Sequence, residues 1–357
     1  MRSLGWLAVC ALLQAANVNA AIGTGPHWPG FKGLQYMFIF GDSYSTVSWA
    51  PTTAPNPTAA SPIGVEWPGV TSVGSFQPNW VGYMTNGFNL SNLLAYDYAI
   101  SGSNITGYTS QIQTEFLPTA GQKPTDITWT ADNSIFVSWI GINDLASATV
   151  PIESTIAQVM QQQQNLYTLG ARNFIFINVP PWDRAPQGTT NTGLKERILT
   201  WNAQLTTSAL AFSNQNTDAS TLVWSSWDTL NTLLNDPARY NLTSPTTVGG
   251  DIWKDDLHPT SAVHYRFAND LAGWLVSLPV GASSSITSSP TPGGVATVTV
   301  GVGATLTVYV PPSQSTATAT VLPSPKSGPS SSSCVKRWSW SWTCFGLSLG
   351  LPIYGFV

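Results

Sequence analysis

An apolar run that ends in a small polar turn constrains this chain most strongly. Residues 36–40 read Tyr-Met-Phe-Ile-Phe and are followed by Gly41, Asp42 and Ser43. Large apolar residues before a glycine predict a short buried strand that stops at Gly41. Because ligands bind beyond the carboxyl ends of strands in open α/β sheets, Ser43 lies where a nucleophilic hydroxyl is useful. An Asp-Ser pair is also an ordinary helix N-cap, so this stretch alone leaves both interpretations open.

Beyond this strand, further apolar runs alternate with segments of helical periodicity. The run at residues 173–179 is almost continuously apolar, as is typical of a parallel strand covered on both faces. The alternation predicts a three-layer α/β/α sandwich with a mostly parallel sheet. Strands are expected at 36–40, 97–101, 134–140, 173–179 and 221–224, and helices at 80–84, 153–169, 195–212 and 260–278.

The composition indicates one large domain with extensions and a neutral substrate. The chain has 357 residues, of which only 8 % are charged, against about a quarter in typical proteins. A net charge of −4 argues against nucleic acid as a partner. Within the body, no apolar stretch is long enough to cross a membrane. The body also lacks cysteine, because Cys10, Cys334 and Cys344 all lie outside it.

The first 20 residues have the regions of a secretory signal peptide in the usual order. Arg2 supplies the positive charge, residues 4–13 the apolar stretch and residues 18–20 a small-residue cleavage site. A buried N-terminal helix is the alternative. Three glycosylation sequons agree with export of a glycoprotein; they begin at Asn89, Asn104 and Asn241.

The C-terminal part differs in composition from the body. We expect a catalytic domain at 21–280, a Ser/Thr/Pro-rich linker or O-glycosylated stalk at 281–333 and an apolar tail at 334–357. Weak alternation at 295–310 predicts a hairpin within the stalk. The tail admits three interpretations: a GPI-anchor signal, an amphipathic membrane-surface segment and a mispredicted C-terminus.

Four short motifs, in order over more than 200 residues, resemble blocks I, II, III and V of the GDSL or SGNH hydrolases. They are Gly-Asp-Ser-Tyr at 41–44, Tyr-Ala-Ile-Ser-Gly-Ser at 98–103, Trp-Ile-Gly-Ile-Asn-Asp at 139–144 and Asp-Asp-Leu-His-Pro at 255–259. Block II departs mildly, since Ser-Gly-Ser stands where a second glycine is usual. The stretches 77–81 and 179–184 are similar to fungal acetylesterases of carbohydrate esterase family 16. The resemblance covers roughly residues 30–278.

The resemblance implies a flavodoxin-like SGNH hydrolase fold and a Ser-His-Asp site. Ser43 would be the nucleophile, His258 the base that takes its proton, and Asp255 the carboxylate that orients the imidazole. The other two histidines are weaker candidates, because His27 precedes every expected strand and His264 lies inside the last expected helix.

The resemblance also implies an oxyanion hole. Its donors would be the backbone N–H groups of Ser43 and Gly102 and the side-chain amide of Asn143, which stays neutral at any working pH. Taken singly, Gly102 can also be a turn glycine and Asn143 part of an Asx turn with Asp144. Asp256 is expected to be solvated or to cap a helix.

Other residues are expected to surround this site. Asp42 and Asp144 would brace the turns that carry Ser43 and Asn143. The Pro-, Thr-, Ser- and Gly-rich stretch at 50–78 predicts a long loop that overhangs the nucleophile. Three tryptophans either form a sugar-binding platform or belong to the core; they are Trp80, Trp139 and Trp182.

These observations predict a secreted, monomeric serine esterase, with surface anchoring through the tail as one option. Its substrate would be an acetylated sugar or oligosaccharide, or another small ester, hydrolysed through an acyl-enzyme intermediate. No metal ion or organic cofactor is implied. The alternatives are a lipase or phospholipase of the same fold and a non-catalytic wall- or glycan-binding protein. The intact set Ser43, Asn143, Asp255 and His258 argues against the last of these.

Overall fold

A six-stranded sheet forms the centre of the computed structural model, which describes residues 20–281, 295–300 and 304–309. The strand order is β1-β6-β5-β4-β2-β3. Neighbouring strands are parallel throughout, except that β1 pairs antiparallel with β6. The strands are β1 (Ala20–Gly23), β2 (Tyr36–Gly41), β3 (Leu94–Asp97), β4 (Ser134–Trp139), β5 (Asn173–Ile177) and β6 (Ser220–Trp224).

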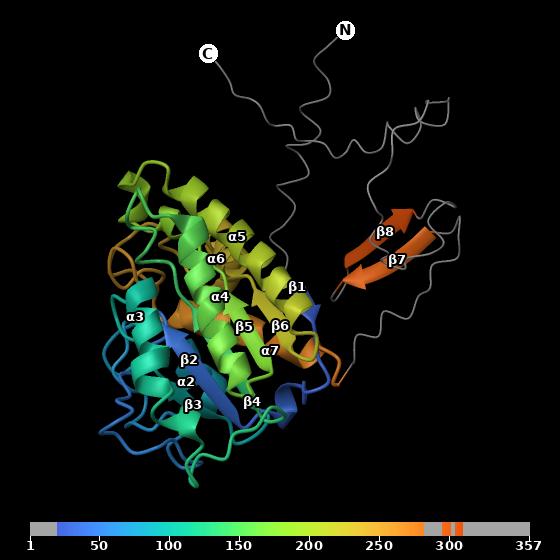
Figure 1. Ribbon diagram of the computed structural model, residues 1–357. Helices are drawn as coiled ribbons and strands as arrows, with labels where there is room; N and C mark the ends of the chain where they lie inside the picture. The colour runs from blue at the N-terminus through green and yellow to red at the C-terminus, as the bar shows by residue number, and fades with distance from the viewer. Residues whose placement is uncertain (1–19, 282–294, 301–303, 310–357) are drawn as a thin grey trace, which may run out of the picture. The chain divides into compact units, whose positions relative to one another are not determined.

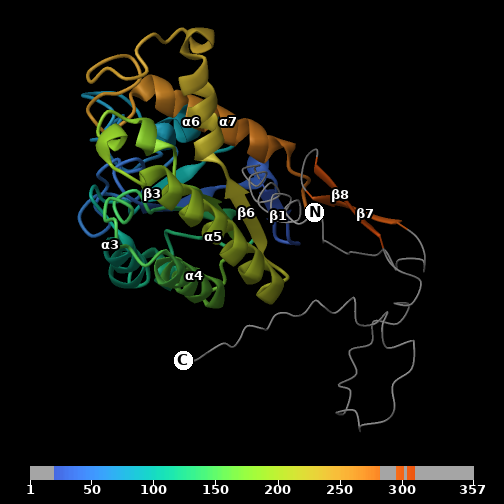
Figure 2. The same ribbon diagram turned by 90° about the horizontal axis from the view of Figure 1, so that it is seen from above.

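Helices cover both faces of this sheet, which confirms the α/β/α sandwich (Figures 1 and 2). One layer contains α3 (Ile105–Ser110), α4 (Ile152–Thr168) and α5 (Leu194–Gln215). The other contains α2 (Trp80–Asn86), α6 (Ser226–Asn235) and α7 (Ser261–Ser277). Shorter helical segments are η1 (Phe31–Gly33), the π-helix η2 (Gln111–Phe116), η3 (Ala120–Gln122), η4 (Trp182–Arg184), η5 (Gly188–Thr190) and η6 (Pro237–Tyr240).

The strand order creates a switch point beside β2. The chain passes from β2 to β3 on one side and then to β4 on the other side of β2. Loops that leave the carboxyl ends of β2 and β4 therefore diverge and leave a crevice between them, which is where open α/β sheets bind ligands.

The core beneath this crevice is strongly aromatic. Phe38 of β2 is fully buried, and its ring centroid lies 5.0 Å from that of Phe136 and 5.2 Å from that of Phe116. Burying one such side chain contributes about 1.5–3 kcal/mol. The three tryptophans also belong to the core rather than to a sugar platform: Trp80, Trp139 and Trp182 are 1 %, 0 % and 3 % exposed.

The expected strand at 97–101 is wrong, because β3 ends where that strand was expected to begin. Asp97 accepts hydrogen bonds from the backbone N–H groups of Ala99 (3.1 Å) and Val47 (2.7 Å). The first of these turns the chain away from the sheet immediately after β3. The sequence also gave no indication of β1, α3, η2 or α6.

The weakly alternating stretch of the expected stalk does form a hairpin. Val295–Val300 (β7) pairs antiparallel with Ala304–Tyr309 (β8). The other predictions for the two ends of the chain lie outside the described residues; they are residues 1–19 of the signal peptide, nearly all of the remaining stalk, the tail and the three cysteines. In the part that is described, no helix is both long and apolar enough to cross a membrane.

Candidate active site

Three neighbouring strand ends and one loop bring the four motifs together. Ser43 follows β2, Gly102 follows β3 and Asn143 follows β4, so all three lie at the carboxyl edge of the sheet. The fourth motif, residues 255–259, immediately precedes α7. Segments that are far apart in the sequence thus meet at the switch point.

Ser43, His258 and Asp255 form a continuous hydrogen-bonded chain. Ser43 Oγ lies 2.9 Å from His258 Nε2. On the other side of the ring, His258 Nδ1 lies 3.0 Å from Asp255 Oδ1 and 2.9 Å from Oδ2. This is the arrangement of nucleophile, base and orienting acid that acyl transfer requires.

Asp255 is held in place by its own turn. Its Oδ1 also accepts the backbone N–H groups of Leu257 (3.0 Å) and His258 (2.6 Å). Partial burial acts to raise the pKa of Asp255, but these hydrogen bonds and the His258 ring outweigh it, so the pKa lies below its ordinary value. By contrast, Asp256 has an exposed side chain and contributes only its carbonyl, which accepts the N–H of Gln187 (2.9 Å).

The three expected oxyanion donors differ in how they are engaged. Among the described residues, the backbone N–H groups of Ser43 and Gly102 donate no hydrogen bond. Gly102 is exposed with φ +81°, a conformation that disfavours other residues. Asn143 Nδ2 donates to the carbonyl of Ser103 (2.8 Å), which fixes the orientation of its amide plane and engages one of two amide protons.

Comparison with known proteins identifies the family of this chain. A profile of the GDSL-like Lipase/Acylhydrolase family matches residues 37–271. The chain belongs to this family. It is therefore a GDSL-type carboxylic ester hydrolase.

A curated relative of this GDSL hydrolase is an acetylesterase from Thermothelomyces thermophilus. The two are 29 % identical over 267 residues, which cover 67 % of this chain and 87 % of the relative. Among solved structures, the acetylxylan esterase Axe2 from Geobacillus stearothermophilus is 15 % identical with a TM-score of 0.44, covering 72 % of this chain and 97 % of that one. A G-D-S-L lipolytic protein from Veillonella parvula is also 15 % identical, with a TM-score of 0.42 and coverage of 68 % and 100 %.

Two residues that brace the site of this GDSL hydrolase were missed by sequence reasoning. The buried Tyr44 donates its hydroxyl to the carbonyl of Leu257 (2.8 Å), tying the Ser43 turn to the loop of His258. Gln111 is fully buried, and its side-chain amide bonds both the N–H (2.9 Å) and the carbonyl (2.7 Å) of Gly41. Tyr44 lies inside a recognised motif, whereas no sequence pattern distinguishes Gln111 from its neighbours.

Ser103 accounts for the departure from the usual second motif. Its side chain is buried, and its hydroxyl oxygen accepts a hydrogen bond from Gln111 Nε2 (3.0 Å). Its carbonyl is the acceptor for Asn143. The Ser103 hydroxyl therefore links the loop after β3 to Gln111 of η2, which a glycine could not do, whereas the carbonyl bond to Asn143 is one that a glycine could also make.

The expected bracing carboxyl groups are buried beneath the turns. Asp42 Oδ1 accepts the N–H of Tyr44 (3.0 Å), and Asp144 Oδ1 accepts the N–H of Ile105 at the start of α3 (3.0 Å). Burial raises the pKa of Asp42 to about 7 and also raises that of Asp144. Neither of these interactions includes Ser43 Oγ or the His258 ring.

The remaining histidines are engaged elsewhere. His264 is buried in α7, where its Nδ1 accepts the N–H of Trp80 (3.3 Å) and burial lowers its pKa to about 3. His27 Nδ1 lies 2.8 Å from Asp132 Oδ1 near the surface. Both findings agree with the expectation that these two histidines are weaker candidates for the base than His258.

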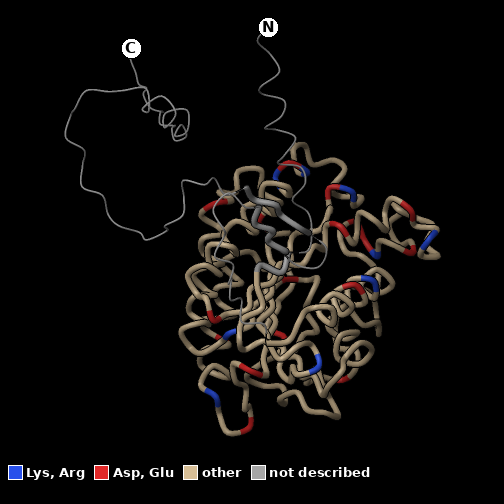
Figure 3. Tube along the Cα trace, turned by 90° about the vertical axis from the view of Figure 1, so that its right-hand side faces the viewer, with Lys and Arg blue, Asp and Glu red and all other residues tan. Residues whose placement is uncertain are grey.

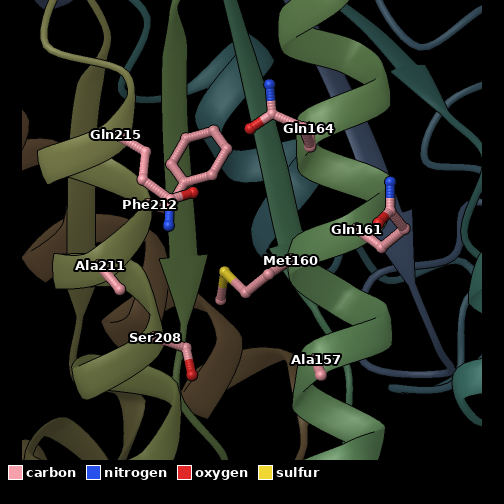
Figure 4. Close-up of a pocket in the computed structure, with 8 residues that line it drawn as sticks. All are labelled: Ala157, Met160, Gln161, Gln164, Ser208, Ala211, Phe212 and Gln215. Carbon is pink, nitrogen blue, oxygen red and sulfur yellow. The ribbon is translucent and has the colours of Figure 1, made fainter.

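A groove of about 320 Å³ between α4 and α5 shares no residue with the site (Figure 4). Gln164 lies along it but exchanges hydrogen bonds with Asn216 at 3.4 and 3.1 Å. The eight residues that line the groove are Ala157, Met160, Gln161, Gln164, Ser208, Ala211, Phe212 and Gln215. The groove therefore offers no route to Ser43.

Proposed function

We propose that this GDSL hydrolase is a secreted serine esterase that removes acetyl groups from sugars or oligosaccharides. The hydrogen-bonded chain from Ser43 through His258 to Asp255 carries the proposal, because it supplies an activated nucleophile beside two uncommitted backbone donors. Ser43, His258 and Asp255 are the proposed catalytic residues. Ser43, Gly102 and Asn143 supply the proposed oxyanion hole.

In the first half of the proposed reaction, His258 Nε2 takes the proton of Ser43 Oγ as the oxygen attacks the ester carbonyl. The carbonyl oxygen becomes an oxyanion that accepts hydrogen bonds from the Ser43 and Gly102 N–H groups and the free amide proton of Asn143. His258 then gives the proton to the leaving alcohol, which leaves acetyl-Ser43.

In the second half, His258 takes a proton from a water molecule that attacks the acetyl group. Collapse of this second oxyanion releases acetate and returns the proton to Ser43 Oγ. Throughout, Asp255 holds the Nδ1–H of the ring and stabilises the imidazolium as it forms.

An acetylated saccharide is supported by two observations. The relative that is 29 % identical carries the name acetylesterase. Charged side chains are also few, at 8 % of the sequence, and are scattered along the trace (Figure 3), as suits a neutral substrate.

A substrate panel tests the proposal. Hydrolysis of p-nitrophenyl esters from acetyl to octanoyl should be fastest for acetyl in kcat/KM, and acetylated oligosaccharides should be deacetylated. If a buried acyl channel existed, each methylene would instead favour the longer chain by about 0.8 kcal/mol. Preference for octanoyl esters would identify the lipase alternative. Absence of hydrolysis of every ester would identify the non-catalytic glycan-binding alternative.

Secretion is a separate part of the proposal and has its own measurement. Mass spectrometry of the mature protein should find an N-terminus after Ala20. If residues 334–357 are a GPI signal, the mature protein should lack them and be released from cells by a phosphatidylinositol-specific phospholipase. Detecting the peptide 344–357 in mature protein would reject the anchor.

A further inference from the structure

We propose that residues 67–77 form a binding subsite for the saccharide part of the ester, with Phe76 as its stacking platform. This inference rests on the proposed function and names the part of the protein that recognises the leaving alcohol. The segment belongs to the loop expected to overhang the nucleophile.

The segment contacts the loops on both sides of the site. At one end of the site, Ser72 Oγ lies 3.4 Å from Ser101 Oγ, next to the oxyanion residue Gly102. The segment 67–77 is also anchored to the chain just beyond Ser43, because Val70 N–H donates a hydrogen bond to the carbonyl of Val47 (3.1 Å). These contacts place residues 67–77 at the rim of the crevice.

A hollow of about 290 Å³ separates this segment from the loop of His258. It is lined by Gly69, Val70, Thr71, Gly74, Ser75, Phe76 and Lys254. Lys254 precedes Asp255, and its Nζ lies 3.7 Å from Asp255 Oδ2. The hollow therefore reaches the side of the site where His258 is held by its acid.

Phe76 is an unusual residue for this position. Its side chain is 91 % exposed, although large aromatic residues are normally buried. It also has φ +57°, a left-handed conformation that is unfavourable for a bulky residue and is frequent at ligand clamps. The carbonyl of the next residue, Gln77, accepts a hydrogen bond from Thr71 Oγ1 (2.9 Å), which closes the turn that presents the ring.

The chemistry around Phe76 suits a sugar better than a lipid chain. A second hollow of about 280 Å³ lies against the same ring and includes Trp67, whose side chain is 44 % exposed. Aromatic faces offer an apolar surface to the C–H face of a sugar ring. Beside them, Ser75, Thr71 and Lys254 offer hydrogen-bonding groups to sugar hydroxyls.

The contact with the loop of His258 and the extent of the hollows assign the subsite to the alcohol rather than to the acyl group. His258 must deliver its proton to the leaving oxygen, so the alcohol departs on the histidine side of the site. Through Lys254, which lies beside Asp255, the first hollow reaches the loop that carries His258. An acetyl group needs no such extended surface.

The test compares a sugar ester with an ester whose alcohol is too small to reach Phe76. Kinetics with acetylated xylo-oligosaccharides and with ethyl acetate are measured for Phe76→Ala, Phe76→Leu and Phe76→Tyr. Val276→Ala, at a position of α7 that is 56 % exposed, is the matched control. Alanine at residue 76 must adopt the same φ as phenylalanine, so thermal melts should be unchanged.

Phe76→Ala should lower kcat/KM for the oligosaccharides by about tenfold, mainly through KM, with ethyl acetate within about twofold of wild type. Phe76→Tyr should retain activity, and Phe76→Leu should lose it because the flat ring is absent. Equal losses on both substrates, or oligosaccharide kinetics like those of Val276→Ala, overturn the subsite alone. A wild-type enzyme that hydrolyses ethyl acetate but no acetylated oligosaccharide overturns the saccharide assignment and the subsite together.

Discussion

Asp255 and Asp256 are adjacent in the sequence but have different surroundings. Asp255 accepts hydrogen bonds from the ring and backbone of His258 and from the N–H of Leu257. The side chain of Asp256 is exposed to solvent. The first residue of an Asp-x-x-His turn can bring its carboxylate back to the imidazole, whereas the residue after it points elsewhere.

We therefore predict that Asp255→Asn loses far more activity than Asp256→Asn. Asparagine at 255 can hold the ring in the wrong tautomer and cannot stabilise the imidazolium. In a serine protease this change costs about ten-thousand-fold in kcat, and a loss of at least about tenfold is expected here. The measurement is kcat/KM of both variants at one pH. A larger loss of kcat/KM in Asp256→Asn than in Asp255→Asn would identify Asp256 as the orienting acid.

A buried carboxyl beneath the site should give the protein a pH-dependent stability. Burial raises the pKa of Asp97 from 3.8 to about 8, and its hydrogen bonds from Ala99 and Val47 only partly oppose this. The native state thus retains a proton that the unfolded chain releases. The stabilisation that Asp97 contributes to the folded state is fully present below about pH 4, and it is lost as the pH rises through about 8.

Asp97→Asn should flatten this dependence, because asparagine does not ionise. At pH 5 the variant should be less stable than wild type, since one amide oxygen replaces two acceptor oxygens. By pH 8 the difference in the free energy of unfolding between wild type and variant should be smaller, because wild type has lost much of the stabilisation from Asp97. Denaturant unfolding of both proteins at the two pH values measures the change, and parallel curves with a constant gap would contradict the raised pKa.

Residues at strand ends were predictable, whereas the residues that brace them were not. Ser43 and Asn143 each follow an apolar run, and the position of a motif after a strand is visible in the sequence. Gln111 lies 70 residues from Gly41, to which it is bonded. Such a contact depends on how the helix packs, and no local pattern encodes it.

At the scale of elements, the π-helix η2 positions the end of β2. Its first residue, Gln111, bonds Gly41 and Ser103, so one side chain links the strand before the nucleophile to the loop after β3. π-Helical turns occur frequently at functional sites. The expected strand at 97–101 failed at the same edge, because the Asp97 side chain competes for backbone groups that would otherwise extend β3.

Replacing Gln111 with methionine should therefore affect both stability and turnover. The change leaves the Gly41 N–H buried without a partner, which costs about 1–3 kcal/mol in the free energy of unfolding. It should also lower kcat, because Ser43 loses its support. Gln113→Met, at an exposed position of the same helix, is the control. Equal effects of the two substitutions would show that η2 does not position the site.

At the scale of the whole molecule, the matched family region ends well before the last residue of the sequence. That region ends at residue 271, and within residues 20–281 the last buried residues of the core are Leu275 and Leu278. Gly281 N–H still donates to the carbonyl of Trp28 (3.0 Å). The three layers were predictable because strand and helix periodicities alternate strongly, whereas β1 is too short to give a signal.

A chain that ends at Gly281 should consequently fold and hydrolyse small esters as the full chain does. We expect its melting temperature to stay within a few degrees and its kcat/KM for ethyl acetate to be unchanged, since every core residue that the structure describes is retained. Thermal melts and kinetics of both forms provide the comparison. Loss of folding would show that residues after 281 stabilise the body.

The central claim is that Ser43 is the nucleophile of this esterase. The decisive measurement is the turnover of p-nitrophenyl acetate by purified Ser43→Ala whose melting curve matches that of wild type. Removal of a serine nucleophile costs about a million-fold in kcat, so the account predicts activity near the uncatalysed background. Turnover close to the wild-type rate by the folded variant would contradict it.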